Sequence, residues 1–185
     1  MSDEQPLMIT AAVDGAEVMR EDTPHVPYTP VEIAEEAARC REAGASMVHV
    51  HGRKEDGTPT QEKETYGTVN FGDDVFMNSM PTVRTIAQRL LKYGITPEIE
   101  VFDTGMVDTA MRLVEEDLLF EPLHFDFVLG VPGGMGARPE SLEFLVDLVP
   151  DGSTWSVAGM GRHELPLAKQ AVEMGGHVRV GLEDN

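Results

Sequence analysis

The sequence is poor in cysteine and in long apolar runs, and each shortage excludes a class of protein. A single cysteine, Cys40, rules out a disulfide framework. No apolar run approaches the roughly 20 residues that a membrane-spanning helix needs. The N-terminus has neither the basic region nor the apolar core of a signal peptide. We therefore expect a cytoplasmic protein.

Positive charge is also scarce. The 185 residues include 33 acidic and 14 basic side chains, for a formal net charge of −19, and only four of the bases are lysines. A surface of this kind does not attract nucleic acid or an anionic membrane, because phosphates are bound by clustered positive charge. The composition otherwise fits one soluble globular domain, with 41% hydrophobic and 25% charged residues.

Apolar runs of strand length alternate with helical patterns along the chain. The helix over 29–44 is the best marked, with Thr29 as N-cap, Pro30 at its first position and Glu32 completing a capping box. This alternation predicts a parallel sheet covered by helices, with functional side chains at the C-terminal ends of the strands. It does not separate a TIM barrel from an open doubly wound sheet. The six expected strands are 6–13, 46–51, 96–102, 125–131, 154–158 and 177–182, and the further helices are 79–94, 107–114, 139–149 and 165–174.

His49 and His51 lie two positions apart in the second expected strand. Side chains two apart on a strand share a face, so both imidazoles would point to one place. Neutral imidazoles suit zinc or a similar divalent ion, and a catalytic zinc site commonly has three protein ligands. Glu183, after the last strand, is a natural third ligand if the two strand ends meet. The spacing alone equally allows two half-buried histidines with no metal.

Seven sequence blocks, in order along nearly the whole chain, are more specific than this pair. They are ITAAVDGAE (9–17), TPVEIAEEA with AGASMVHVHGR (29–53), NFGDD (70–74), PEIEVFDTGM (97–106), FVLGVPGGM (127–135), WSVAGMGR (155–162) and GGHVRVGLEDN (175–185). Together they resemble the β-keto acid cleavage enzymes, whose best-known type acts on 3-keto-5-aminohexanoate in lysine fermentation, a route of amino-acid degradation.

The resemblance implies a TIM (β/α)8 barrel that forms a homo-oligomer, a tetramer, and binds zinc or another divalent metal. It implies an acyltransferase that condenses a β-keto acid with acetyl-CoA by Claisen and retro-Claisen steps. The products are acetoacetate and a new acyl-CoA. For 3-keto-5-aminohexanoate the new acyl-CoA is 3-aminobutanoyl-CoA.

Residue roles follow from the same resemblance. The metal ligands would be His49, His51 and Glu183. Arg179 and Asp184 would remove a proton from the substrate, with Glu100 orienting the arginine; Glu17 would hold the substrate's ammonium group, and Thr68 would lie near its carboxylate. The chemistry agrees, since a metal ion in a dry pocket stabilises an enolate and a carboxylate base needs a pKa tuned by its neighbours. A plain ion pair is the other interpretation of Arg179 and Asp184.

The glycine-rich loop over 132–136 allows two interpretations. Its backbone amides, with Arg138 beyond them, would bind a coenzyme A phosphate. Alternatively, the glycines serve only the geometry of a tight loop.

The interval between the second strand and NFGDD is shorter than the family pattern requires. Roughly two strands are missing between about 57 and 70, including the strand that carries an active-site serine in the family, and the last helix is also missing. We expect one barrel domain over 1–185, incomplete at these two places. Either the sequence omits residues, which predicts a spatial discontinuity between Gly57 and Asn70, or the protein is a truncated homologue.

Two other functions compete with this one. A metal-dependent hydrolase of the amidohydrolase type also uses His-x-His on a strand, but it would need further histidines at later strand ends. A non-catalytic, truncated homologue would need no metal.

Overall fold

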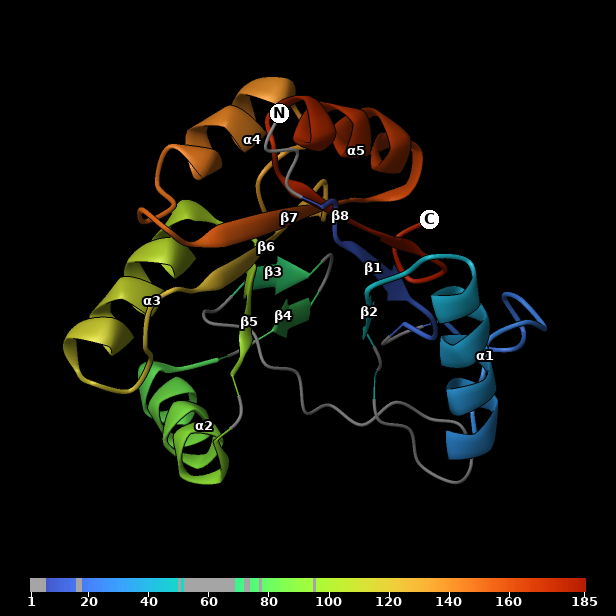
Figure 1. The fold of residues 1–185 in the computed structure, drawn as a ribbon, viewed down its shortest axis with the longest axis horizontal. Coiled ribbons are helices and arrows are strands. Elements are labelled where there is room, and N and C mark those ends of the chain that lie inside the picture. The colour runs from blue at the N-terminus through green and yellow to red at the C-terminus, as the bar shows by residue number, and fades with distance from the viewer. Residues whose placement is uncertain are drawn as a thin grey trace.

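The computed structural model describes residues 6–15, 18–49, 51, 69–71, 74–76, 78–94 and 96–185. Strands and helices alternate along the chain, as the sequence predicts (Figure 1). The strands are β1 (Ile9–Ala12), β2 (Met47–His49), β3 (Val69–Phe71), β4 (Asp74–Phe76), β5 (Glu98–Val101), β6 (His124–Leu129), β7 (Thr154–Gly159) and β8 (His177–Gly181). The helices are α1 (Pro30–Glu42), α2 (Met80–Tyr93), α3 (Thr104–Glu115), α4 (Pro139–Val146) and α5 (Glu164–Glu173), which follows a 3₁₀ turn, η1 (Gly161–His163).

Six parallel strands form one curled sheet in the order β2-β1-β8-β7-β6-β5. The first and last strands of the chain are neighbours, with Ala12 opposite Gly181. The pairing of the first strand with the last, in a curled sheet, is the arrangement of part of a TIM barrel and not of an open doubly wound sheet. Figure 1 shows the resulting half-barrel, and all six expected strands are confirmed.

A short antiparallel hairpin, β3–β4, forms a sheet of its own. Neither strand is among the six that the sequence predicts, because three-residue strands are too short to show a period of two. The discontinuity predicted between Gly57 and Asn70 falls on a segment outside the described residues, except for Val69 and Asn70 at its end.

Local capping explains where α1 and α3 begin. Glu32 N donates to Thr29 Oγ1 at 3.2 Å, and Thr29 N donates to the Glu32 carboxylate at 2.9 Å, so the predicted capping box is present. Helix α3 begins three residues before the prediction, because Asp103 caps it by accepting from Gly105 N at 3.0 Å. No helix within the described ranges is long and apolar enough to cross a bilayer.

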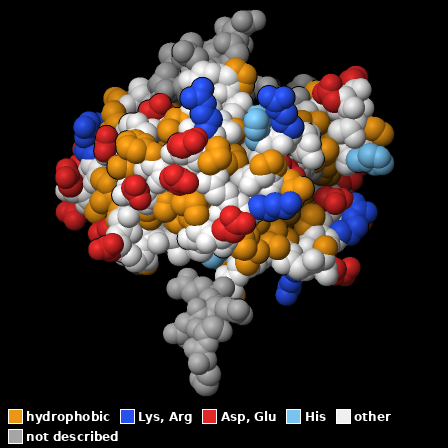
Figure 2. Space-filling view, turned by 90° about the horizontal axis from the view of Figure 1, so that it is seen from above, with side chains coloured by type: hydrophobic (Ala, Val, Ile, Leu, Met, Phe, Trp, Pro, Cys, Tyr) orange, Lys and Arg blue, Asp and Glu red, His pale blue; other side chains and the backbone are white. Residues whose placement is uncertain are grey.

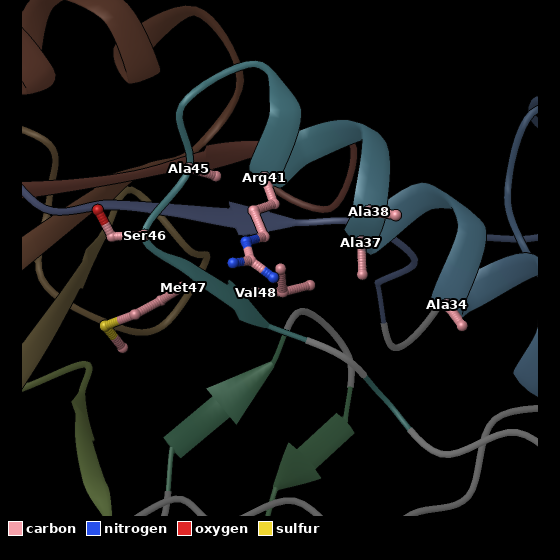
Figure 3. Close-up of a pocket in the computed structure, with 8 residues that line it drawn as sticks. All are labelled: Ala34, Ala37, Ala38, Arg41, Ala45, Ser46, Met47 and Val48. Carbon is pink, nitrogen blue, oxygen red and sulfur yellow. The ribbon is translucent and has the colours of Figure 1, made fainter.

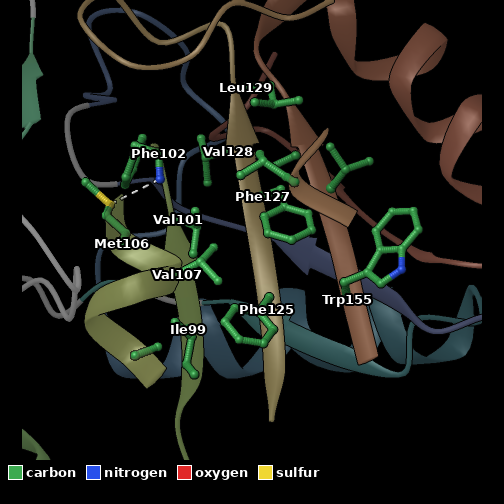
Figure 4. Packing of buried hydrophobic residues seen from close by; sticks show 14 of the residues in the cluster. Ile99, Val101, Phe102, Met106, Val107, Phe125, Phe127, Val128, Leu129 and Trp155 are labelled. Carbon is green, nitrogen blue, oxygen red and sulfur yellow. Dashed lines mark hydrogen bonds between the residues drawn. The ribbon is translucent and has the colours of Figure 1, made fainter. Parts of the chain in front are cut away.

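The main core lies between the sheet and its helices (Figure 4). Phe125 and Phe127 stack with ring centroids 6.2 Å apart, and Trp155 lies 6.1 Å from Phe127. These side chains pack with apolar residues of α3, α4 and α5. Because side chains alternate along a strand, the residues between them face the barrel interior. There Glu100, Asp126, Ser156 and His177 lie opposite one another on neighbouring strands.

A groove of about 560 Å³ lies beside β2 (Figure 3). It is lined by Ala34, Ala37, Ala38, Arg41, Ala45, Ser46, Met47 and Val48. Within the six-stranded sheet β2 is a terminal strand, paired only with β1. The groove therefore follows the outer face of the barrel at the edge where the described sheet stops.

Candidate metal centre and active site

His49, His51 and Glu183 converge at the C-terminal ends of β2 and β8. The Nε2 atoms of the two histidines are 2.9 Å apart, and their rings are tilted at 71°. Glu183 Oε1 is 2.8 Å from His51 Nε2, and Glu183 Oε2 is 3.4 Å from His49 Nε2. The strands β2 and β8 both flank β1 and run parallel to it, so their carboxyl ends meet at one edge of the sheet.

Two features of the first strand and its loop support this arrangement. The carboxylate of Asp14 is fully buried and accepts from His51 N, at 3.0 Å to Oδ1 and 3.2 Å to Oδ2. Gly15 has φ +67°, and a Cβ there would lie 3.3 Å from the Cα and Cβ of Glu183. Asp14 directly follows the expected strand 6–13 and is not among the predicted site residues.

The protonation states of His49 and Glu183 suit a divalent cation. Burial lowers the pKa of His49 to about 4, helped by the charge of Arg179 and opposed by that of Glu183. Burial acts to raise the pKa of Glu183, but the His51 hydrogen bond and the Arg179 charge outweigh it and lower that pKa to about 2. A neutral imidazole and a carboxylate are both ligands that zinc uses.

A buried oxygen also points to a missing partner. Glu183 Oε2 is buried and accepts no hydrogen bond from the described residues. One ligand atom from each of His49, His51 and Glu183 lies within 4.8 Å of the others, and among the described residues this is the one group that can hold a metal ion. The residues present therefore fit a metal centre.

Arg179 lies beside this group and is 2% exposed. Its Nε and Nη2 donate to the two oxygens of Asp184 at 3.1 and 3.0 Å. Its Nη1 donates to Glu100 Oε1 and to Asp126 Oδ2, both at 2.9 Å. Nη2 is also 3.4 Å from Glu183 Oε2. The five N–H groups of the guanidinium are thus directed at four carboxylates.

The charges of this cluster tune Asp184. Burial raises the pKa of Asp184 to about 7, with Glu183 and Asp126 acting in the same direction and Arg179 opposing them. A carboxyl group that gains and loses a proton near neutral pH is suited to general acid–base work. Burial acts to lower the pKa of Arg179, but the surrounding carboxylates raise it well above its ordinary value. Arg179 therefore stays charged.

The sequence analysis also missed Asp126 and Ser156. Asp126 is fully buried between Phe125 and Phe127, and its Oδ1 accepts from Ser156 Oγ at 2.5 Å. An acid inside an apolar strand is costly unless it is paired, and this was the signal available in the sequence.

The remaining inward histidines belong to other contacts. His124 Nδ1 lies 2.8 Å from Thr154 Oγ1, and its Nε2 is 3.4 Å from Glu98 Oε2. His177 Nδ1 accepts from Met8 N at 3.1 Å. Neither joins the metal group.

Of the eight predicted site residues, six come together in the structure. They are His49, His51, Glu183, Arg179, Asp184 and Glu100. Glu17 and Thr68 lie outside the described residues.

Two backbone amides of the glycine-rich loop are hydrogen-bonded within the protein. Gly134 N donates to Val131 O at 3.0 Å, and Met135 N donates to Phe102 O at 2.9 Å. This favours the tight-loop interpretation over phosphate binding.

Several known proteins are similar to this chain in sequence or in fold. A sequence model of the beta-keto acid cleavage enzyme family matches residues 6–69 and 65–185. The 3-keto-5-aminohexanoate cleavage enzyme of Fusobacterium nucleatum is 42% identical over 228 aligned positions, covering 98% of this chain and 83% of that protein. The 3-oxoadipate:acetyl-CoA acetyltransferase of Cupriavidus necator is 32% identical, with 98% and 81% covered. A solved complex of ObcA with a C4-CoA adduct and oxalate shares the fold, with TM-score 0.69 and 19% identity. The match covers 88% of this chain and 58% of the ObcA chain.

Proposed function

The chain belongs to the beta-keto acid cleavage enzyme family, and on that premise we propose that it condenses a β-keto acid with acetyl-CoA to give acetoacetate and a new acyl-CoA. One observation supports this proposal above the others. The three possible metal ligands lie beside the buried Arg179. This arginine donates two hydrogen bonds to the carboxylate of Asp184, whose pKa is raised to about 7.

We propose 3-keto-5-aminohexanoate as the β-keto acid, with 3-aminobutanoyl-CoA as the new thioester. The name of the F. nucleatum relative supports this choice. Glu17 would hold the ammonium group and Thr68 would lie near the substrate carboxylate. The reaction would belong to lysine fermentation.

In the proposed mechanism Asp184 is the base. A divalent metal, zinc by preference, held by His49, His51 and Glu183 would supply positive charge that stabilises an enolate. Arg179 fixes both oxygens of Asp184, so that one of them can take the proton between the keto and carboxylate groups of the substrate. Glu100 holds the far corner of the guanidinium.

The carbon that has lost its proton then attacks the thioester carbonyl of acetyl-CoA, and the CoA thiolate leaves. The thiolate then attacks the original keto carbon. The bond between this keto carbon and the carbon that had lost its proton breaks. The products are the new acyl-CoA and the acetoacetate carbanion. Asp184 returns its proton to this carbanion, which restores the base and balances the reaction.

We also propose that the chain forms a homo-oligomer, a tetramer. Phe144 on α4 and Leu165 and Val172 on α5 are 54%, 64% and 52% exposed, which supports an interface there. Apolar side chains also lie among acidic ones on the face seen in Figure 2.

We also propose that the single barrel domain over 1–185 lacks one β-α-β excursion between about residues 57 and 70. The family match divides at 65–69. The 228 positions aligned with the F. nucleatum relative exceed the 185 residues of this chain. The groove beside β2 offers space for such a unit. Inserting the relative's segment at this point should raise the melting temperature, and an unchanged or lower value would count against the proposal.

Metal analysis combined with an acetyl-CoA-dependent assay tests the function. We expect about one metal ion per chain and acetoacetate formed in equal amount to acetyl-CoA consumed. Hydrolysis of the substrate without acetyl-CoA consumption would instead indicate a hydrolase of the amidohydrolase type. An inert protein without metal would indicate a non-catalytic homologue.

A further inference from the structure

We infer that Asp126, held by Ser156, is a positioning residue that aligns Arg179 with Asp184; as a role in proton transfer, this rests on the proposed function. The hydrogen bonds of Asp126 come from Arg179 and Ser156, neither of which is a proposed metal ligand. It acts through the arginine.

Both oxygens of Asp126 are fixed. Oδ2 accepts from Arg179 Nη1 at 2.9 Å, and Oδ1 accepts from Ser156 Oγ at 2.5 Å. Ser156 lies directly opposite Asp126 in the register of β6 and β7. Asp126 and Ser156 are 0% and 1% exposed, so water does not replace either contact. The carboxylate therefore cannot turn without losing a buried hydrogen bond.

The geometry of the guanidinium explains why this matters. Its Nε and Nη2 edge grips Asp184, and Nη1 at the opposite corner is held by Asp126 and Glu100. The Glu100 side chain is 18% exposed, whereas that of Asp126 is 1% exposed. Asp126 is thus the rigid support on that side. Without it, the guanidinium can swing toward Glu100 and draw its other edge away from Asp184.

A purely structural ion pair explains the arrangement less well. Burying charges costs several kcal/mol per ion, and well-packed apolar residues often serve stability as well or better. Ser156 adds a second buried polar group, whose hydroxyl lies 3.4 Å from His124 Nε2 and makes its short hydrogen bond, of 2.5 Å, to the carboxylate of Asp126. A shift of about 1 Å in a reacting group can cost about 100-fold in rate, so fixed orientation has value for catalysis.

The test uses three variants and one control. Ser156→Ala removes the support and leaves the carboxylate, Asp126→Asn removes the charge at constant shape, and Ser156→Thr keeps a hydroxyl. Ser153→Ala is the matched control, because Ser153 Oγ also joins the β6 and β7 segments by accepting from Leu123 N at 3.1 Å. The first measurement is solvent exchange of the Arg179 Nε–H signal by nitrogen-15 NMR. The second is kcat and KM for the acetyl-CoA-dependent reaction, with bound metal recorded for each variant.

We expect Ser156→Ala to speed Nε–H exchange about tenfold and lower kcat about tenfold, and Asp126→Asn to lower kcat about 100-fold. KM should stay within about threefold and the metal content should not change, because substrate and metal contacts are untouched. Ser156→Thr should return both measurements to within about threefold of the wild type, and Ser153→Ala should match the wild type.

Two results would overturn the inference. One is unchanged Nε–H exchange in both Ser156→Ala and Asp126→Asn. The other is an equal loss of kcat in Ser153→Ala, which would mark a general effect of weakening these strands. If the wild type makes no acetoacetate, the proposed function fails, while the exchange measurement still decides whether Asp126 and Ser156 position Arg179.

Discussion

Glu183 Oε1 lies 2.8 Å from His51 Nε2, although 132 positions separate the two residues in the chain. The contact exists because β1 pairs in parallel with both β2 and β8. The C-terminal ends of β2 and β8 therefore lie on the same side of the sheet, separated only by β1. Four carboxylates around Arg179 then give the site an excess of negative charge, which a divalent cation would offset.

Replacing His51 tests the metal centre. His51→Ala removes one of three ligands, so bound metal should fall from about one ion per chain to below about a tenth, and acetoacetate formation should disappear with it. Elemental analysis of the purified protein measures the first effect. His25→Ala, at an exposed position, is the control and should keep its metal. Full metal occupancy in His51→Ala would show that the ion binds elsewhere.

Replacing Asp184 separates the base from the metal. Asp184→Asn should keep its metal ion but lose about 10²- to 10⁴-fold in kcat, the usual contribution of a general base. Exchange of the substrate's acidic hydrogen for deuterium, followed by proton NMR without acetyl-CoA, should fall in parallel. Asp108→Asn on the exposed side of α3 is the matched change. An Asp184→Asn variant with wild-type turnover would refute the base assignment.

Asp14 should control metal affinity through the backbone of His51. Asp14→Ala removes the acceptor of the His51 amide, and loss of such a supporting hydrogen bond typically costs about 10- to 100-fold in metal affinity. Competition with a chelator of known affinity gives the dissociation constant. Asp22→Asn is the control, because Asp22 accepts from Met19 N in an exposed turn. Equal affinities in Asp14→Ala and the wild type would contradict the prediction.

Glu98 should make stability depend on pH. Burial and the charge of Asp126 raise the pKa of Glu98 from 4.5 to about 8, so the folded protein holds this proton more tightly than the unfolded chain does. The free energy of unfolding should therefore fall as pH rises from about 4.5 to 8, on the order of 5 kcal/mol from this group.

Urea unfolding of the wild type and Glu98→Gln across this range measures the effect. Glu98→Gln stays neutral, so it should gain stability over the wild type as pH rises. Glu115→Gln on the exposed side of α3 should follow the wild-type curve. A constant difference between Glu98→Gln and the wild type at every pH would exclude this titration.

Much of the fold was predictable because its signals are local. The capping box of Thr29 and Glu32 defines the start of α1 within four residues. The apolar runs of the six strands are each visible in a window shorter than ten residues. The start of α3 at Thr104, after its cap Asp103, was missed because apolar periodicity begins only after the helix does.

The site residues that belong to family sequence blocks could be predicted from the sequence. Those that become partners only through pairing between strands could not. The blocks containing His49, His51 and Glu183 identify these residues without a structure. Asp126 and Ser156 are 30 positions apart, and only the register of β6 and β7 makes them partners.

By itself, the sequence determined the six strands, the order of helices between them and the shared face of His49 and His51, because backbone periodicity acts over a few residues. Tertiary structure alone decided that Asp126 of β6, held by Ser156 of β7, joins Glu100 and Asp184 around Arg179. The physical reason is that strand order and register arise from packing between distant segments. No local pattern encodes which buried charge will meet which.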